Sequence, residues 1–176
     1  MGAAAARAAR SADAFIALRP TLPLESAGIV NSVLFGAGRH VVLYPNAVSA
    51  RGEFNQIMIA WNGTRACARA IAEAMPYLER ARSVAICTVV DNVIPEDFDL
   101  GAAVAHLRRH AIEPDARRLA RRAGGVGETL LMEAQRSRAD LIVLGGYSHA
   151  RLQELLLGGV TRKLLHEATT TLLMAH

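Results

Sequence analysis

The sequence has little of what marks secreted, zinc-binding or membrane-spanning proteins. Its two cysteines, Cys67 and Cys87, lack the paired spacing of a zinc site and are too few for a disulfide framework. The alanine-rich first residues lack the apolar core of a secretory signal. The longest apolar runs, such as LIVLGG, are far shorter than the roughly 20 residues that span a bilayer. We therefore expect a cytoplasmic protein with no structural metal and no contact with a membrane.

Aromatic residues and excess charge are also scarce. Phe, Trp and Tyr make up 5% of the chain, and 20 basic residues face 16 acidic ones. The arginines cluster at 108–109 and 117–122 without interleaved aromatic residues on which bases could stack. We therefore expect no nucleic-acid partner. The 52% hydrophobic content of the 176 residues is ample for a buried core.

From residue 56 onward the sequence alternates between β-rich runs and amphipathic helical periods, which predicts βα units. Thr64 has the residue type and place of a helix N-cap. The fold class that we predict is α/β, an open five-stranded parallel sheet with helices on both faces, like a Rossmann fold. The expected strands are 56–63, 83–90, a polar edge strand near 113–120, 140–146 and 170–176, and the expected helices are 65–81, 99–111, 126–139 and 159–168.

The first part of the chain reads as a partial repeat of its last part. ADAFIALRP at 12–20 parallels ADLIVLGGY at 139–147, and the segment 32–45 parallels the segment that ends at residue 176. We interpret residues 1–54 as the remnant of a preceding domain plus a linker at 46–54, and residues 55–176 as the main domain. Chance similarity of composition is the alternative. A remnant would expose sheet edges, so we expect it to dock on the main domain or to pair with a second chain.

Three loops follow the carboxyl ends of predicted strands, where open α/β sheets bind their ligands. They are 60–64, 89–92 and 145–150, and a second glycine pair opens the helix that begins near residue 159. Glycine lets a phosphate approach backbone N–H groups, and a helix N-terminus favours an anion. Glycine is equally common at strand-to-helix turns without any ligand, so the residues alone leave a phosphate site and simple turns both open.

Residues 55–176 resemble the universal stress protein family, an adenine nucleotide alpha hydrolase-like fold whose nucleotide signature is G-x2-G-x9-G-[ST]. Gly145, Ser148, Gly158 and Gly159 take its four positions. The second and fourth positions depart from the pattern, because Ser148 carries a side chain and Gly159 has no hydroxyl. Asn62 stands where the family commonly has an acidic residue at the end of the first strand.

The resemblance implies a non-catalytic stress-response protein that binds ATP or another adenine nucleotide. It also implies a homodimer, or a paired domain, formed through the last strand at 169–176. Slow ATP hydrolysis is an alternative, for which Asp91 and Glu154 are the available acids, and a nucleotide-free interaction module is another. The implied nucleotide site comprises Ala60, Trp61, Asn62, Gly63, Val90, Gly145, Ser148, His149, Gly158, Gly159, Val160 and Thr161.

Overall fold

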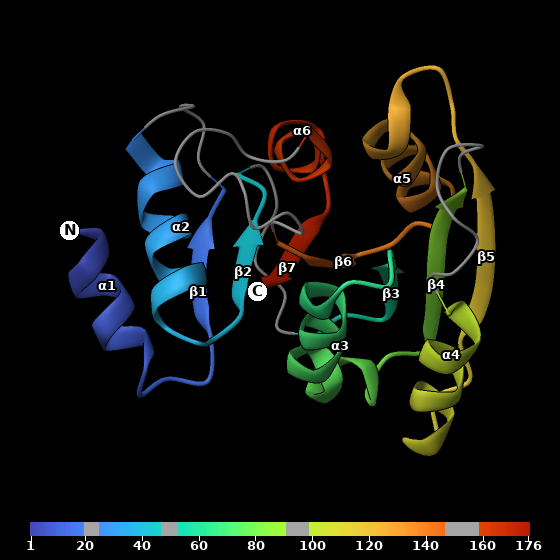
Figure 1. The fold of residues 1–176 in the computed structure, drawn as a ribbon, viewed down its shortest axis with the longest axis horizontal. Coiled ribbons are helices and arrows are strands. Elements are labelled where there is room, and N and C mark those ends of the chain that lie inside the picture. Colours follow the sequence, from blue (N-terminus) through green and yellow to red (C-terminus); the bar gives the residue numbers. More distant parts are fainter. Residues whose placement is uncertain (20–24, 47–52, 91–98, 147–158) are drawn as a thin grey trace.

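The computed structural model describes residues 1–19, 25–46, 53–90, 99–146 and 159–176. These residues form a three-layer α/β structure with one sheet between two layers of helices (Figure 1). The strands are β1 (Phe15–Leu18), β2 (Val41–Tyr44), β3 (Gln56–Ala60), β4 (Ser83–Val90), β5 (Asp115–Ala120), β6 (Leu141–Gly145) and β7 (Thr171–Ala175). The helices are α1 (Gly2–Ala9), α2 (Glu25–Gly36), α3 (Arg65–Leu78), α4 (Leu100–Arg109), α5 (Gly125–Arg136) and α6 (Gly159–Glu167).

The sheet has seven strands in the order β1-β2-β7-β6-β3-β4-β5, so the prediction of five strands was wrong. The five strands of residues 56–175 are parallel to one another, as predicted, and β5 is the polar edge strand. The additional strands β1 and β2 are parallel to each other, and β2 joins β7 in antiparallel orientation. The edge of β7, which we expected to pair with a partner, therefore pairs with β2 of the same chain.

Helices cover both faces of the sheet, as predicted. Buried side chains of α2, α5 and α6 pack on one face, and those of α3 and α4 pack on the other, so that α3 and α4 lie opposite α5 and α6 in Figure 1. Helix α3 owes its place to a stripe of small and apolar residues that face the sheet. The stripe consists of Ala66, Cys67, Ala70, Ile71, Ala74 and Leu78.

The strand–helix–strand unit β1–α2–β2 repeats the unit β6–α6–β7 about an approximate two-fold axis. Where β2 meets β7, Val42 lies directly opposite Leu173. Val41 pairs with Met174 on one side of this centre and Leu43 pairs with Leu172 on the other, so a two-fold rotation that exchanges the strands maps one pair onto the other. The backbone N–H of Arg19 donates to Tyr44 at 2.7 Å, and that of Gly146 donates to Ala175 at 2.7 Å. The helices bury matching positions, which are 30, 33, 34 and 37 in the first unit and 161, 164, 165 and 168 in the second.

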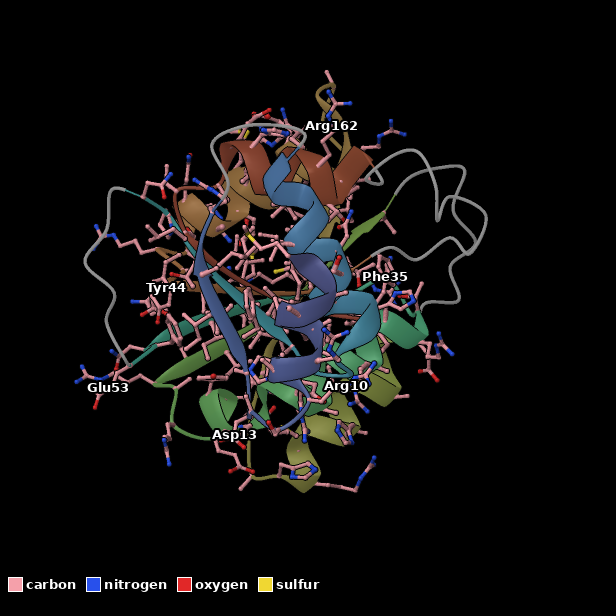
Figure 2. All side chains as sticks on the ribbon, turned by 90° about the vertical axis from the view of Figure 1, so that its left-hand side faces the viewer. Arg10, Asp13, Phe35, Tyr44, Glu53 and Arg162 are labelled. Atoms are coloured by element: carbon pink, nitrogen blue, oxygen red, sulfur yellow. The ribbon has the colours of Figure 1, made fainter. Side chains whose placement is uncertain are left out.

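Strand β1 lies at one end of the sheet and leaves apolar side chains exposed. Phe15 and Ala17 pack toward α2, whereas Ile16 is 62% exposed and Leu18 is 64% exposed. Figure 2 views the molecule from this end, with α1, α2 and β1 nearest the viewer. In the second unit the corresponding face of β6 is buried, and Val143 there is fully buried in the core beside α3. The two units thus differ in what covers β1 and β6, because β1 is the edge strand of the sheet and β6 lies inside it.

A polar cluster around the buried His40 ties the first unit to α3. His40, which precedes β2, is buried, and its Nδ1 lies 2.9 Å from Glu73 Oε2. Arg69 pairs with the same carboxylate at 2.6 Å, and its guanidinium also donates to Gly38 at 3.1 Å. These contacts fix residues 36–41 against the helix that begins at the candidate site.

A buried carboxylate, that of Glu133 in α5, joins α5 to β5. It is 7% exposed and accepts from Arg136 at 2.7 and 2.9 Å and from Arg117. The hydrogen bond from Arg136, followed by that from Arg117, holds the pKa of Glu133 below its ordinary value, although burial acts in the opposite direction.

We expect Glu133→Gln to reduce the free energy of unfolding at pH 7 by about 1–3 kcal/mol, because the charged acceptor of both arginines is lost. Since folding lowers the pKa, this stabilisation is present above the unfolded-state value and disappears as pH falls through the folded-state value. Urea denaturation at pH 7 and at pH 3 measures it, and the difference from the unmodified chain should shrink at pH 3. Glu128→Gln, at a more exposed residue of the same helix, is the control. A difference that is independent of pH would contradict the assignment.

Candidate functional site

The carboxyl end of β3 remains tied to β4 for one residue beyond the strand. The backbone N–H of Trp61 donates to Cys87 at 2.9 Å, and the hydroxyl of Thr88 donates to the Trp61 carbonyl at 3.1 Å. Trp61 is partly buried and packs on the core cluster that lies beneath α3 and α4. Ala60 is buried, and Val90 at the end of β4 is partly buried. These contacts fix the direction in which the chain leaves the sheet toward Asn62.

A short turn, residues 62–64, then leads into α3. Gly63 has a φ of +70°, a conformation that glycine adopts without steric cost. The side chain of Thr64 accepts from Cys67 N at 3.4 Å, which confirms the predicted N-cap. The carbonyl oxygen of the Asn62 side chain accepts from Thr64 N at 3.3 Å and from the Thr64 hydroxyl at 2.7 Å.

Cys67 is part of this turn, which the sequence analysis did not predict. Its thiol lies 2.9 Å from Asn62 Oδ1 and 3.3 Å from the carbonyl of Ala60. The spacing of the residues could have predicted this contact. An Asn two residues before an N-cap forms an Asx turn, and the third residue of the helix, here Cys67, then faces the Asn side chain. The thiol therefore helps to hold the Asn62 side chain in one orientation.

Gly145, at the end of β6, lies against the first turn of α3. A Cβ atom built on Gly145 would lie 2.5 Å from Cys67 N and 2.7 Å from the carbonyl carbon of Ala66. These distances are far below van der Waals contact, so only glycine lets the helix begin this close to the strand. The structure thus brings together the turn at 60–64 and Gly145, and it gives Gly145 a packing role that needs no ligand.

Gly146 also has structural contacts. Its carbonyl lies 2.9 Å from His176 Nδ1, and a Cβ at this position would approach Leu34 to 2.7 Å. Gly159 differs from both glycines, because it is exposed at the start of α6 and a Cβ there would meet nothing within 4 Å. Among the described residues, Gly159 therefore leaves the start of α6 uncovered.

The first turns of α3 and α6 favour an anion. Neither contains an acidic residue, and each contains an exposed arginine, Arg65 in α3 and Arg162 in α6, the latter labelled in Figure 2. Unpaired N–H groups and the helix dipole give a helix N-terminus a positive potential. Val160 is partly buried and Thr161 is buried, so the side chain of Thr161 faces the protein interior.

Strand β4, which pairs with β3, carries the buried thiol of Cys87. Burial, with a further contribution from Glu133, raises the pKa of the Cys87 thiol to about 12, so this thiol is protonated at neutral pH. Within the described ranges no three His, Cys, Asp or Glu side chains gather as metal ligands would.

The remaining predicted positions cannot be placed. Ser148, His149 and Gly158, and the alternative acids Asp91 and Glu154, lie outside the described residues. At Val90 the backbone carbonyl accepts from Arg121 N at 3.1 Å. The structure thus brings the turn that follows Ala60 together with Gly145, which lies against the first turn of α3, and it places Gly159 at the start of α6.

The fold is that of the open α/β proteins, in which ligands bind beyond the carboxyl ends of the strands, where this chain carries Gly145 and the capped start of α3. Among family models, that of the universal stress protein family matches residues 53–176. The chain belongs to this family. A comparison with curated protein sequences finds no significant match.

Solved structures share the fold. A universal stress protein from Archaeoglobus fulgidus superposes with a TM-score of 0.74 at 13% identity, covering 96% of this chain and 62% of that one. The universal stress protein UspA from Lactobacillus plantarum has a TM-score of 0.53 at 19% identity, covering 72% of this chain and 100% of that one. A universal stress protein in complex with cAMP has a TM-score of 0.57 at 19% identity, covering 71% and 98%. The chain thus spans less than two thirds of the Archaeoglobus protein.

None of the helices among the described residues is long and apolar enough to cross a membrane.

Proposed function

We propose that this chain is a stress-response protein that binds an adenine nucleotide and does not require catalysis for its function. The nucleoside lies beside Asn62 and Val90, and the phosphates lie at Gly145 and the start of α6. The observation that carries the proposal is the start of α6, where no described residue lies within 4 Å of a Cβ position on Gly159 and the first turn lacks acidic residues. Membership of the family and the relative solved with cAMP support the choice of an adenine nucleotide.

Native mass spectrometry of the chain purified without added ligand tests the proposal, followed by denaturation and identification of any released molecule. We expect an adenine nucleotide bound to the chain, or binding of ATP, AMP or cAMP when each is added. A chain that stays empty with all three would show that the glycines serve only as turns, and would leave an interaction module.

The variant Gly159→Asp makes the test specific to the phosphate end. A carboxylate here repels a phosphate, whereas at a helix N-terminus it stabilises the helix, so we expect nucleotide affinity to fall by about tenfold or more with no loss of stability. The repeat supplies a matched control, because Gly28 of α2 corresponds to Gly159 and likewise has nothing within 4 Å of its Cβ position. Gly28→Asp should leave nucleotide affinity unchanged. Equal losses of affinity in both variants would refute the assigned place of the phosphates.

We also propose that residues 1–54 are the remnant of a preceding domain of the same family, followed by a linker. The two-fold relation between β1–α2–β2 and β6–α6–β7 supports this origin. The cytoplasm remains the proposed location, which the two buried, unpaired thiols support.

A further inference from the structure

Strand β1 lies at the end of the sheet that faces the viewer in Figure 2, and no strand of the described residues pairs with its outer edge. The backbone N–H groups of Phe15 and Arg19 donate to carbonyl groups of the segment that contains β2, at 3.0 and 2.7 Å. Because successive residues of a strand direct these groups to opposite sides, the N–H and carbonyl groups of Ile16 and Leu18 point away from β2. The outer edge of β1 therefore offers them to another strand.

The same two residues, Ile16 and Leu18, carry the exposed apolar side chains of β1. The strand has no charged residue, whereas β5 at the other end of the sheet carries Asp115, Arg117 and Arg118. Charged side chains on an edge strand oppose its pairing with a further chain. The sheet is thus protected against such pairing at β5 and not at β1.

The internal repeat shows which kind of partner cannot cover β1. Leu18 of β1 corresponds to Gly145 of β6, since each is the last residue in the register of its strand pair. Helix α3 lies so close to β6 that a Cβ on Gly145 would be 2.5 Å from Cys67 N. Leu18 has such a Cβ, so no helix can lie on β1 as α3 lies on β6. A strand at the free edge, which meets Leu18 side chain to side chain, avoids this conflict.

We propose that β1 pairs with β1 of a second copy of this chain, antiparallel about a two-fold axis that passes between the two Ala17 residues. In this register Ile16 of each copy lies opposite Leu18 of the other, and the two residues exchange both backbone hydrogen bonds. The exposed aliphatic side chains then form two cross-strand pairs on one face of the sheet. The continuous sheet ends at β5 on both sides, so association stops at the dimer.

The flanks and the size of β1 determine the orientation and the strength of the pairing. Asp13 precedes the strand and Arg19 follows it, so antiparallel pairing brings the acidic end of one copy toward the basic end of the other, whereas parallel pairing brings like charges together. A standard interface uses about 20–30 residues on each side, and β1 with the exposed residues of α1 supplies fewer. The dimer is therefore of the weak class, with a Kd of roughly 1–100 µM.

Sedimentation velocity of the full chain, from about 1 µM to about 500 µM, tests the proposal. We expect monomer at the low end of the range and dimer at the high end. Ile16→Lys and Leu18→Lys should each raise the Kd at least tenfold, because a lysine on an edge strand opposes pairing. Met132→Lys is the matched control, since it places the same charge at another exposed apolar residue, on α5. It should leave the Kd unchanged.

Three results would contradict the proposal. They are a chain that stays monomeric over the whole range, a dimer that both lysine variants leave intact, and oligomers that grow beyond the dimer. Ile16 and Leu18 are exposed in the single chain, so both variants should keep its stability. Thermal denaturation at the lowest concentration checks this, and loss of the dimer in a folded variant then reports on the edge of β1.

Disulfide cross-linking tests the register. In a non-hydrogen-bonded antiparallel pair the Cα atoms are about 4.5 Å apart, which a disulfide can span. The two Ala17 residues form such a pair, so Ala17→Cys should give a covalent dimer on mild oxidation. The two copies of Ile16 lie on a diagonal of roughly 7–8 Å, so Ile16→Cys should not. The native Cys67 and Cys87 are buried and do not interfere. Cross-linking through Ile16→Cys but not through Ala17→Cys would refute this register.

Discussion

Gly145→Ala should destabilise the ligand-free protein by about 1–3 kcal/mol, because the added methyl group meets the backbone of α3 rather than a side chain that could move. Cys67 N would lie 2.5 Å from the new carbon, so the first turn of α3 must shift away from β6. For a chain of this length each kcal/mol corresponds to roughly 2–4 °C in melting temperature. Thermal denaturation without nucleotide measures the effect.

Gly159→Ala is the matched control, since a methyl group there meets nothing within 4 Å. Its stability should be unchanged or raised by up to about 1 kcal/mol through the lower entropy of the unfolded chain. Comparison of the two variants distinguishes a glycine needed for packing from a glycine that leaves room for a phosphate, the two roles that the sequence left open. A Gly145→Ala protein that is as stable as the parent but no longer binds nucleotide would show that Gly145 serves the ligand and not the packing.

Val42→Asp should cost about 4 kcal/mol or more and detach the first strand–helix–strand unit from the rest. Val42 is 1% exposed at the centre of the pairing between β2 and β7, opposite Leu173. A charge at this position would be buried without a partner, and substitutions that bury an unpaired charge are among the most destabilising. Chemical denaturation gives the loss of stability. Hydrogen exchange should show that the β7 amides lose protection on the side of β2.

Ile16→Asp provides the comparison within the same unit. Ile16 is 62% exposed on β1, so the same charge remains in water and the change in stability should stay within about 1 kcal/mol. Similar losses in both variants would mean that the unit is held to the main domain by contacts other than the β2–β7 pairing. The polar cluster of His40, Glu73 and Arg69 would then be the next contact to test.

The sequence predicted the local elements of residues 55–176 well because each carries its own periodicity. The stripe from Ala66 to Leu78 defines α3, and the uninterrupted apolar run at 141–144 defines a strand buried on both faces. Even the polar edge strand β5 was found, since it follows a helix and precedes another in the alternating order.

The number of strands could not be predicted in the same way. Whether β1 and β2 join the sheet depends on the pairing of residues 41–43 with residues 172–174, which no local pattern encodes. The sequence indicated that the first unit would dock or pair elsewhere, and the structure shows docking. The orientation of the Asn62 amide was equally inaccessible, because it depends on Thr64 and Cys67 together.

The central position of β7 has a consequence for how the chain folds. β7 follows every other strand in the sequence, yet it lies third in the sheet, between β2 and β6. During synthesis the apolar edges of β2 and β6 therefore stay unpaired until β7 leaves the ribosome, which happens after both of them are made. Pairings between distant segments also form slowly, because much of the loop-closure entropy is lost before they are made. The strand inserted last therefore lies inside the sheet. Until it is made, the incomplete chain has two unpaired strand edges, those of β2 and β6, which chaperones would have to shield.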